Sequence, residues 1–137
     1  MNRSIALLIA ILLVAGCASA PTPTAPGSTG NAALATTVSV AEAATLRDQG
    51  AFILDVREPD EWTDGHIPGA TLIPLGELAS RIDEVPRDQP IVVVCRSGNR
   101  SAEGRDILLG AGFPTVTSLD GGMTDWARAG MPIETGA

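Results

Sequence analysis

The sequence predicts an α/β fold, a doubly wound domain in which a parallel β-sheet is covered by helices on both faces. Two observations lead to this prediction. Short apolar segments at residues 52–56, 91–94 and 115–119 have the composition of buried strands, and helix-like segments alternate with them along the chain. Such alternation is typical of a parallel sheet between two layers of helices. About a hundred residues, 37–137, are enough for one domain of this kind.

The first helix is expected at residues 41–49. Ser39 and Glu42 have the spacing of a capping box, in which each side chain bonds the backbone N–H of the other residue. Gly50 follows the last helix-favouring residue, and glycine there suits the left-handed conformation that often ends a helix. The sequence therefore predicts a helix with defined ends, followed directly by the strand at 52–56.

The middle of the chain contains shorter elements. A helical turn is expected at 60–62, a loop marked by Gly and Pro at 65–70, and a short strand at 71–73. Residues 75–84 are expected to form a helix, because apolar residues recur there at the spacing i, i+3, i+4, i+7. Two prolines then bracket a turn before the strand at 91–94.

The last third of the chain repeats the alternation. A helix is expected at 101–111, where Gly112 ends it, and the strand at 115–119 follows. A short final helix is expected at 123–129, closed by Gly130 and a proline. These elements complete the predicted sheet and its two helical layers.

Composition limits the kinds of partner. The net charge is −7 at pH 7, and the nine basic residues are all arginines. This balance argues against binding to nucleic acid, whose backbone requires a basic face. An anionic substrate must therefore be held by local positive groups. Because the chain has no CxxC motif and only one histidine, we expect no metal site, and we expect no cofactor.

The amino terminus has the features of an export signal. Arg3 precedes an apolar run at 5–15, which is too short to span a bilayer but matches the hydrophobic region of a signal peptide. The run ends in Val14-Ala15-Gly16-Cys17, which resembles the lipobox of bacterial lipoproteins. The other interpretation is an ordinary secretory signal, cut near the small residues at 18–20.

The lipobox resemblance implies that residues 1–16 are removed and that Cys17 carries lipid. Several acyl chains anchor a protein stably where one does not. The rest of the segment 17–36 is rich in Pro, Thr, Ala and Gly, a composition that cannot bury enough surface to order itself. We therefore expect an exported domain on a flexible linker, anchored by lipid on the periplasmic or cell-surface side of a bacterial membrane.

The segment after the strand at 91–94 contains the candidate nucleophile. Cys95 stands at the carboxyl end of this strand, where open α/β sheets bind ligands. The polar loop that follows contains Gly98 and leads into a helix, so its N–H groups and the helix dipole can attract an anion. Arg96 and Arg100 add positive charge. Together these groups can lower the pKa of the Cys95 thiol and hold an anionic substrate.

Other interpretations of Cys95 exist. Free cysteine is commonly a small, buried and inert residue, in which case the loop is merely a turn. Two cysteines can also in principle pair, although Cys17 already has a function in the lipobox interpretation. The two arginines, the glycine and the following helix favour the functional interpretation.

Residues well beyond the loop resemble a known family. The chain is similar to single-domain rhodaneses, which are sulfurtransferases, over nearly all of 37–137. The residues that match the family's signatures, in order along the chain, are 55–58, 61–62, 65–70, 95–101, 121–122, 126, 130 and 132. The resemblance implies a rhodanese-like domain at 37–137.

The resemblance also implies a mechanism. Cys95 would be the catalytic residue, taking a sulfur atom from a donor such as thiosulfate to form a persulfide. A thiol or cyanide would then accept that sulfur. Arg96 and Arg100 would orient the anionic donor. The backbone groups of the remaining loop residues would bind substrate and stabilise the persulfide; these residues are Ser97, Gly98 and Asn99.

Polar residues elsewhere have structural interpretations. Asp55 and Arg57 lie at the end of the first long strand, and we interpret them as an ion pair that supports neighbouring loops. His66 is interpreted as a hydrogen-bonded turn residue, and Trp62 and Trp126 as packing residues. We expect the domain to be a monomer.

Two other functions compete with sulfur transfer. Phosphatases and arsenate reductases of related architecture have a Cys-x5-Arg loop around a tetrahedral anion, whereas Cys95 and Arg100 are one residue closer. The shorter loop favours sulfur. A non-turnover persulfide carrier or sensing module is the second alternative, because the loop residues alone do not separate a carrier from a catalyst.

Overall fold

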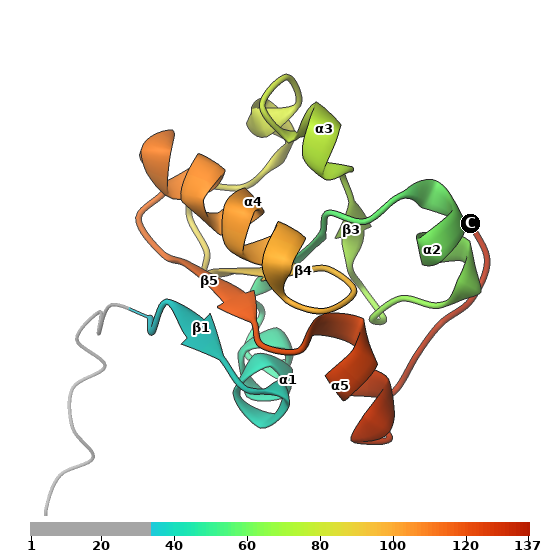
Figure 1. Cartoon of the computed structure of the whole chain (residues 1–137). Coiled ribbons are helices and arrows are strands. Elements are labelled where there is room, and N and C mark those ends of the chain that lie inside the picture. Colours follow the sequence, from blue (N-terminus) through green and yellow to red (C-terminus); the bar gives the residue numbers. More distant parts are fainter. Residues whose placement is uncertain (1–33) are drawn as a thin grey trace, which may run out of the picture. The chain divides into compact units, whose positions relative to one another are not determined.

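The computed structural model describes residues 34–137, which contain one parallel five-stranded sheet in the order β1-β5-β4-β2-β3 (Figure 1). All the strand pairs in it are parallel, so the α/β prediction is confirmed. The strands are β1 (Thr37–Val38), β2 (Phe52–Asp55), β3 (Thr71–Leu72), β4 (Ile91–Val94) and β5 (Val116–Leu119).

Helices cover both faces of the sheet, with α3 and α4 on one face and α1 and α5 on the other (Figure 1). The helices are α1 (Val40–Asp48), α2 (Pro59–Asp64), α3 (Leu75–Leu78), α4 (Asn99–Gly110) and α5 (Gly122–Arg128), with a 3₁₀ turn η1 (Ile82–Glu84). None of the helices in residues 34–137 has the length and apolarity that crossing a membrane requires.

The central strand β4 contributes side chains to the hydrophobic cores on both faces of the sheet. Ile91 and Val93 pack into the core under α3 and α4, whereas Val92 and Val94 pack into the core under α1 and α5. Side chains alternate between faces along a strand, and a strand covered on both faces is therefore apolar at every position. This arrangement explains the unbroken β-branched run before Cys95 and places Cys95 at the carboxyl edge of the sheet.

The capping box predicted for α1 is confirmed, and the helix spans Val40–Asp48, one residue earlier at each end than the predicted 41–49. The Ser39 N–H donates to the Glu42 carboxylate at 2.8 Å, and the Glu42 N–H donates to the Ser39 hydroxyl. Gly50 follows the helix with a φ of 94°, a left-handed conformation that glycine adopts without steric cost.

The single helix predicted at 75–84 is wrong. The chain forms α3, breaks at Ala79–Arg81, and resumes only as the 3₁₀ turn η1. Gly76 and Ser80 are weak helix formers, and the Ser80 hydroxyl bonds the Glu77 carbonyl at 2.8 Å. The apolar periodicity correctly indicated the face that packs on the core, because Leu78 is buried and Leu75 and Ile82 pack against it.

Three other elements differ from prediction. The helix α4 begins at Asn99 rather than at 101, because Gly98 adopts a φ of 103° and its carbonyl accepts the N–H of Ala102. The helix α2 spans Pro59–Asp64 rather than only 60–62. The edge strand β1 was not predicted from sequence, since two residues carry too little periodicity to recognise.

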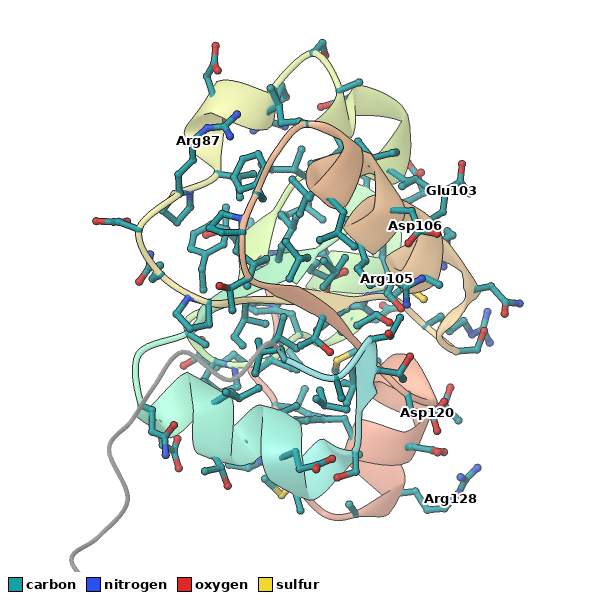
Figure 2. The ribbon with its side chains drawn as sticks, turned by 90° about the vertical axis from the view of Figure 1, so that its left-hand side faces the viewer. Arg87, Glu103, Arg105, Asp106, Asp120 and Arg128 are labelled. Carbon is teal, nitrogen blue, oxygen red and sulfur yellow. The ribbon has the colours of Figure 1, made fainter. Side chains whose placement is uncertain are left out.

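The strand β1 is held in place by contacts with distant residues. It pairs with β5, and the Ser118 N–H donates to the Thr36 carbonyl at 3.2 Å. Figure 2 shows Arg105 extending from α4 toward this edge of the sheet, where its guanidinium donates to the Thr36 carbonyl and the Ser118 hydroxyl. The predicted signal peptide (1–16), Cys17 and the linker residues up to 33 lie outside the described residues.

Candidate active site

The thiol of Cys95 lies at the start of the loop that joins β4 to α4. The residue is 1% exposed, and its sulfur accepts the Gly98 N–H at 3.1 Å. As a thiol, Cys95 donates to the Ser101 hydroxyl at 3.5 Å, and that hydroxyl donates in turn to the Gly98 carbonyl at 2.9 Å. The loop therefore folds around the sulfur atom.

Opposing effects act on the pKa of Cys95. Burial raises this pKa, because a charge is poorly solvated there, but hydrogen bonds with Ser101 and the backbone N–H groups of Ser97 and Gly98 lower it by more. The pKa consequently lies below its ordinary value. When the thiolate forms, the Ser101 hydroxyl can turn from the Gly98 carbonyl to donate to sulfur. The site is built to favour the reactive, ionised form.

Replacement of Ser101 by alanine is expected to raise the pKa of Cys95. The variant removes a hydrogen bond that favours the thiolate and leaves the burial unchanged. Ionisation, and with it reactivity, should therefore begin at higher pH than in the wild type. The rate of alkylation by iodoacetamide, measured against pH, reports this shift. An alkylation profile that stays in place or moves to lower pH would show that Ser101 does not stabilise the thiolate.

The amino end of α5 packs against the same loop. The Met123 N–H donates to the Cys95 carbonyl at 2.8 Å, and the Thr124 N–H donates to the Arg96 carbonyl at 3.0 Å. Gly122, at a φ of 56°, allows this approach, because a Cβ there would lie 2.7 Å from the Arg96 carbonyl carbon and closer still to the Cys95 carbonyl oxygen. Gly122 belongs to one of the matched signatures, but its role could not be recognised from the sequence. Its role is to let α5 fix the loop backbone.

The two loop arginines have different environments. Arg96 is exposed, whereas Arg100 donates two hydrogen bonds to the carboxylate of Glu61 on α2, at 2.7 and 2.8 Å. These bonds lower the pKa of Glu61 to about 2, so the pair stays charged until the pH falls to that region. From the sequence, both arginines were expected to be free cations at the rim. The partner of Arg100 could not be recognised there, because it lies 39 residues away along the chain.

Replacement of Glu61 by glutamine is expected to lower the pKa of Cys95 further. The pKa of Arg100 is raised mainly by its bonds to Glu61 and also by the charge of the Cys95 thiolate, so the guanidinium and the thiolate interact. Without the neutralising carboxylate, Arg100 should stabilise the thiolate more strongly. The pH profile of alkylation should move opposite to that of Ser101→Ala.

A matched control removes the same charge elsewhere on this side of the molecule. Glu103 is exposed on α4 and forms no ion pair with any of the described residues; Figure 2 labels it on the outer side of that helix. Glu103→Gln should leave the alkylation profile nearly unchanged. Equal shifts in the two variants would attribute the effect to net charge rather than to the pair with Arg100.

Asp55 and Arg57 form a buried ion pair. The Arg57 guanidinium donates to the Asp55 carboxylate at 2.6 and 2.9 Å and to the carbonyl oxygens of Gly65 and Glu61 at 2.8 and 3.2 Å. It thereby connects the end of β2 to α2 and to the residue that follows this helix. The pair supports the segment that contains Glu61, which agrees with the interpretation as a loop support.

His66 is packed rather than free. Its ring stacks on Trp62 with centroids 3.6 Å apart, and Nδ1 lies 3.0 Å from the Trp62 carbonyl. Its backbone exchanges two hydrogen bonds with Glu134. Trp126 is fully buried, and its indole N–H donates to the Pro132 carbonyl. These residues hold the C-terminal segment, and no three His, Cys, Asp or Glu side chains in residues 34–137 are grouped as a metal site requires.

The sequence is similar to a described domain family and to known sulfurtransferases. A model of the family described as "Rhodanese-like domain" matches residues 39–129. A thiosulfate sulfurtransferase, GlpE, of Pseudomonas syringae is 42% identical over 94 residues, which are 69% of this chain and 88% of that protein. A putative sulfur carrier protein, YrkF, of Bacillus subtilis is 40% identical over 79 residues, covering 58% of this chain and 43% of that protein.

A solved structure has the same arrangement of elements. The crystal structure of a rhodanese-related protein from Thermoplasma volcanium superposes with a TM-score of 0.68 at 30% identity, and the match covers 73% of this chain and 98% of that one. The family match at residues 39–129 contains strands β2 to β5, helices α1 to α5 and the loop around Cys95. On these grounds the chain belongs to the rhodanese-like domain family.

Proposed function

We propose that the protein is a sulfurtransferase that carries sulfur as a persulfide on Cys95, with thiosulfate as donor. The observation that carries the proposal is the setting of the Cys95 sulfur. It accepts an N–H from the loop and lies beside the Ser101 hydroxyl, at the amino end of α4, with its pKa lowered by these bonds. The family membership and the similarity to a thiosulfate sulfurtransferase support the same activity.

The first step loads the enzyme. The Cys95 thiolate attacks the outer sulfur of thiosulfate, and a new bond forms between the two sulfur atoms. The sulfur–sulfur bond within thiosulfate breaks, and its electron pair leaves with sulfite. The total charge is the same before and after. The products are sulfite and a Cys95 persulfide anion, and no oxidant or metal is required.

The loop supplies the stabilisation that this step needs. Negative charge moves outward by one sulfur atom, toward the backbone N–H groups of the loop and the amino end of α4. Arg96, exposed and without an ion-pair partner among the described residues, offers positive charge to the doubly charged donor. Arg100 contributes less than the sequence suggested, because Glu61 neutralises it.

The second step discharges the persulfide. A cyanide ion or a thiolate attacks the outer sulfur, the bond to Cys95 breaks, and the electron pair returns to the Cys95 sulfur. The enzyme is then ready for another donor. Phosphate transfer is a poorer fit, because the arginine that would be expected to grip a tetrahedral phosphate is engaged with Glu61 and the loop is one residue short.

The proposal is tested by mass. The chain from Asn31 onward contains the whole described core, and Cys95 is its only cysteine. After incubation with thiosulfate, its intact mass should rise by one sulfur atom, and cyanide should remove that sulfur as thiocyanate. A chain that never gains sulfur, or that releases phosphate from phosphate esters instead, would overturn the proposal.

A carrier function has its own signature in the same experiment. The similarity to a putative sulfur carrier protein is the observation that favours it. In that case the sulfur adduct would form, but discharge to every thiol tried would be slow. Rapid, repeated turnover with at least one thiol would instead establish a catalyst.

We also propose that the protein is exported and anchored by lipid on Cys17. The support is the sequence around that residue, with the apolar run at 5–15 and the small residues directly before the cysteine. In cells, the full-length protein should fractionate with membranes and the Cys17→Ser variant should not. A wild-type protein in the soluble cytoplasmic fraction would exclude the anchor.

A further inference from the structure

A groove of about 340 Å³ lies beside the loop that contains Cys95. It is bordered by the end of α2, by Arg96 of the loop, by one face of α5 and by the C-terminal segment. Pockets that bind small organic molecules begin at about 300 Å³, and one water molecule takes about 30 Å³ of liquid. Thiosulfate has only five non-hydrogen atoms. The groove therefore has room for a substrate larger than the donor.

The charges that face the groove are of two kinds. Arg57 and Glu61 border it, but the first is bound to Asp55 and the second to Arg100. Asp64 and Arg96 also border it, are exposed, and form no ion pair or side-chain hydrogen bond with other residues of 34–137. The groove thus offers one carboxylate from α2 and one guanidinium from the loop, each able to bind an opposite charge.

Among the remaining lining residues, three have apolar side chains and Thr124 has a hydroxyl group. Met123 and Ala127 line it from α5, and Ile133 lines it from the C-terminal segment. Ile133 is 41% exposed, and Leu109 is the only other large hydrophobic residue as exposed in residues 34–137. The Ile133 side chain packs on Gly65, where a Cβ would lie 2.8 Å from one of its methyl groups. The groove is thus lined by apolar side chains as well as by two opposite charges.

We propose that this groove binds the sulfur acceptor and that the acceptor is a small zwitterionic thiol of the amino-acid type. Its carboxylate would pair with Arg96, its ammonium group with Asp64, and its methylene group would lie on Ala127 and Ile133. This inference rests on the proposed function, since it requires a persulfide on Cys95. Arg96 directly follows Cys95 in the loop and also borders the groove, so an acceptor paired with Arg96 would be bound one residue along the chain from the persulfide.

The chemistry of the transfer is balanced. The acceptor thiol loses its proton to solvent, and its thiolate attacks the outer sulfur of the Cys95 persulfide. A sulfur–sulfur bond forms on the acceptor, the bond to Cys95 breaks, and the electron pair returns to the Cys95 sulfur. The product is the persulfide of the acceptor. No additional oxidant or reductant takes part.

The test measures discharge of the chain from Asn31 onward after loading with thiosulfate. Four acceptors are compared: cysteine, which carries both charges; 3-mercaptopropionate, which carries only the carboxylate; 2-mercaptoethanol, which is neutral; and cyanide. For each acceptor, the discharge rate of the variant is divided by the discharge rate of the wild type. This ratio cancels the differences in intrinsic reactivity among the acceptors. Loss of sulfur from the protein is followed by intact mass.

Two variants test separately how the charge and the shape of the groove contribute to binding of the acceptor. Asp64→Asn should raise the cysteine concentration needed for half-maximal discharge about two- to fivefold, as expected for one exposed ion pair, and should not change that for 3-mercaptopropionate. Ala127→Trp should slow discharge to cysteine by at least about fivefold, because the indole fills much of a groove of this size. Ala129→Trp, at an exposed position just beyond α5 that does not border the groove, is the matched control.

The outcomes distinguish this inference from the proposed function. If no sulfur loads, the proposed function fails. If sulfur loads and cyanide removes it, but neither Asp64→Asn nor Ala127→Trp changes discharge to cysteine, the groove is not the acceptor site. If Ala127→Trp slows cyanide equally, the effect is not specific to the acceptor and the inference is overturned. A cysteine-containing peptide with blocked termini is a further acceptor. If it discharges the wild type faster than cysteine does, and if only Ala127→Trp removes this advantage, the acceptor is a peptide and the inference is overturned.

Discussion

Replacement of Cys95 by serine is expected to abolish both the sulfur adduct and the formation of thiocyanate. In the proposed mechanism the attacking group is a thiolate, and its pKa is lowered by the hydrogen bonds of the loop. A serine hydroxyl ionises far less readily, and an oxygen atom cannot form the persulfide. Because no other group in the loop can replace the thiol, activity should fall to the uncatalysed background. Intact mass after thiosulfate and a colorimetric thiocyanate assay measure the two losses.

The loss must be separated from a folding defect. Serine is close to cysteine in shape, and its hydroxyl can accept the Gly98 N–H and donate to Ser101, so the fold should persist. Far-UV circular dichroism and the urea midpoint should stay close to those of the wild type. A folded Cys95→Ser protein that still produced thiocyanate would exclude Cys95 as the sulfur carrier.

Replacement of Arg57 by methionine is expected to lower the free energy of unfolding by about 3–5 kcal/mol, as is typical when one partner of a buried ion pair is removed. The side chains of Arg57 and Asp55 are 6% and 1% exposed, so the carboxyl group left behind lacks both its partner and solvation by water. The variant also removes bonds to the carbonyls of Gly65 and Glu61. Urea unfolding followed by circular dichroism measures the loss.

Two further variants identify the cause. The double variant Asp55→Asn, Arg57→Met has no unpaired buried carboxyl group at position 55. Its amide oxygen can still accept the backbone N–H of residue 57, so the double variant should be more stable than Arg57→Met alone. Arg81→Met breaks exposed ion pairs with Glu77 and Glu84 and should scarcely change the urea midpoint. Equal losses in Arg57→Met and Arg81→Met would show that burial of the pair is not what makes it important.

The fold class followed from local signals because those signals arise from neighbouring residues. The unbroken apolar run 91–94 indicated a strand buried on both faces, and β4 is such a strand. The capping box of Ser39 and Glu42 defined the start of α1. The prediction of a helix at 75–84 was wrong because the signal used for it reports burial rather than helix stability. Its apolar periodicity came from burial against the core, whereas Gly76 and Ser80 weakened the helix itself.

Part of the candidate site could also be predicted from residues that are adjacent in sequence. A cysteine at the end of a β-branched run, followed by a glycine loop and a helix, is recognisable because all of these residues are adjacent in sequence. The orientation of the loop is not local. The carbonyls of Cys95 and Arg96 are held by N–H groups of α5, and the space for that contact depends on Gly122. Sequence spacing contains no information about which helix approaches which loop.

The sequence by itself determined the parallel sheet apart from its edge strand β1 and the order of its strands, the position of Cys95 at the carboxyl edge and the kind of chemistry a thiol in a glycine loop can perform. Only the tertiary structure decided which charges remain free. Arg96 and Arg100 look equivalent along the chain, but packing brings Glu61 from α2 to Arg100 and leaves Arg96 beside the groove with Asp64. The physical reason is that hydrogen bonds and ion pairs act over a few ångströms. The partner of a charged side chain is therefore chosen by which elements pack together, not by distance along the chain.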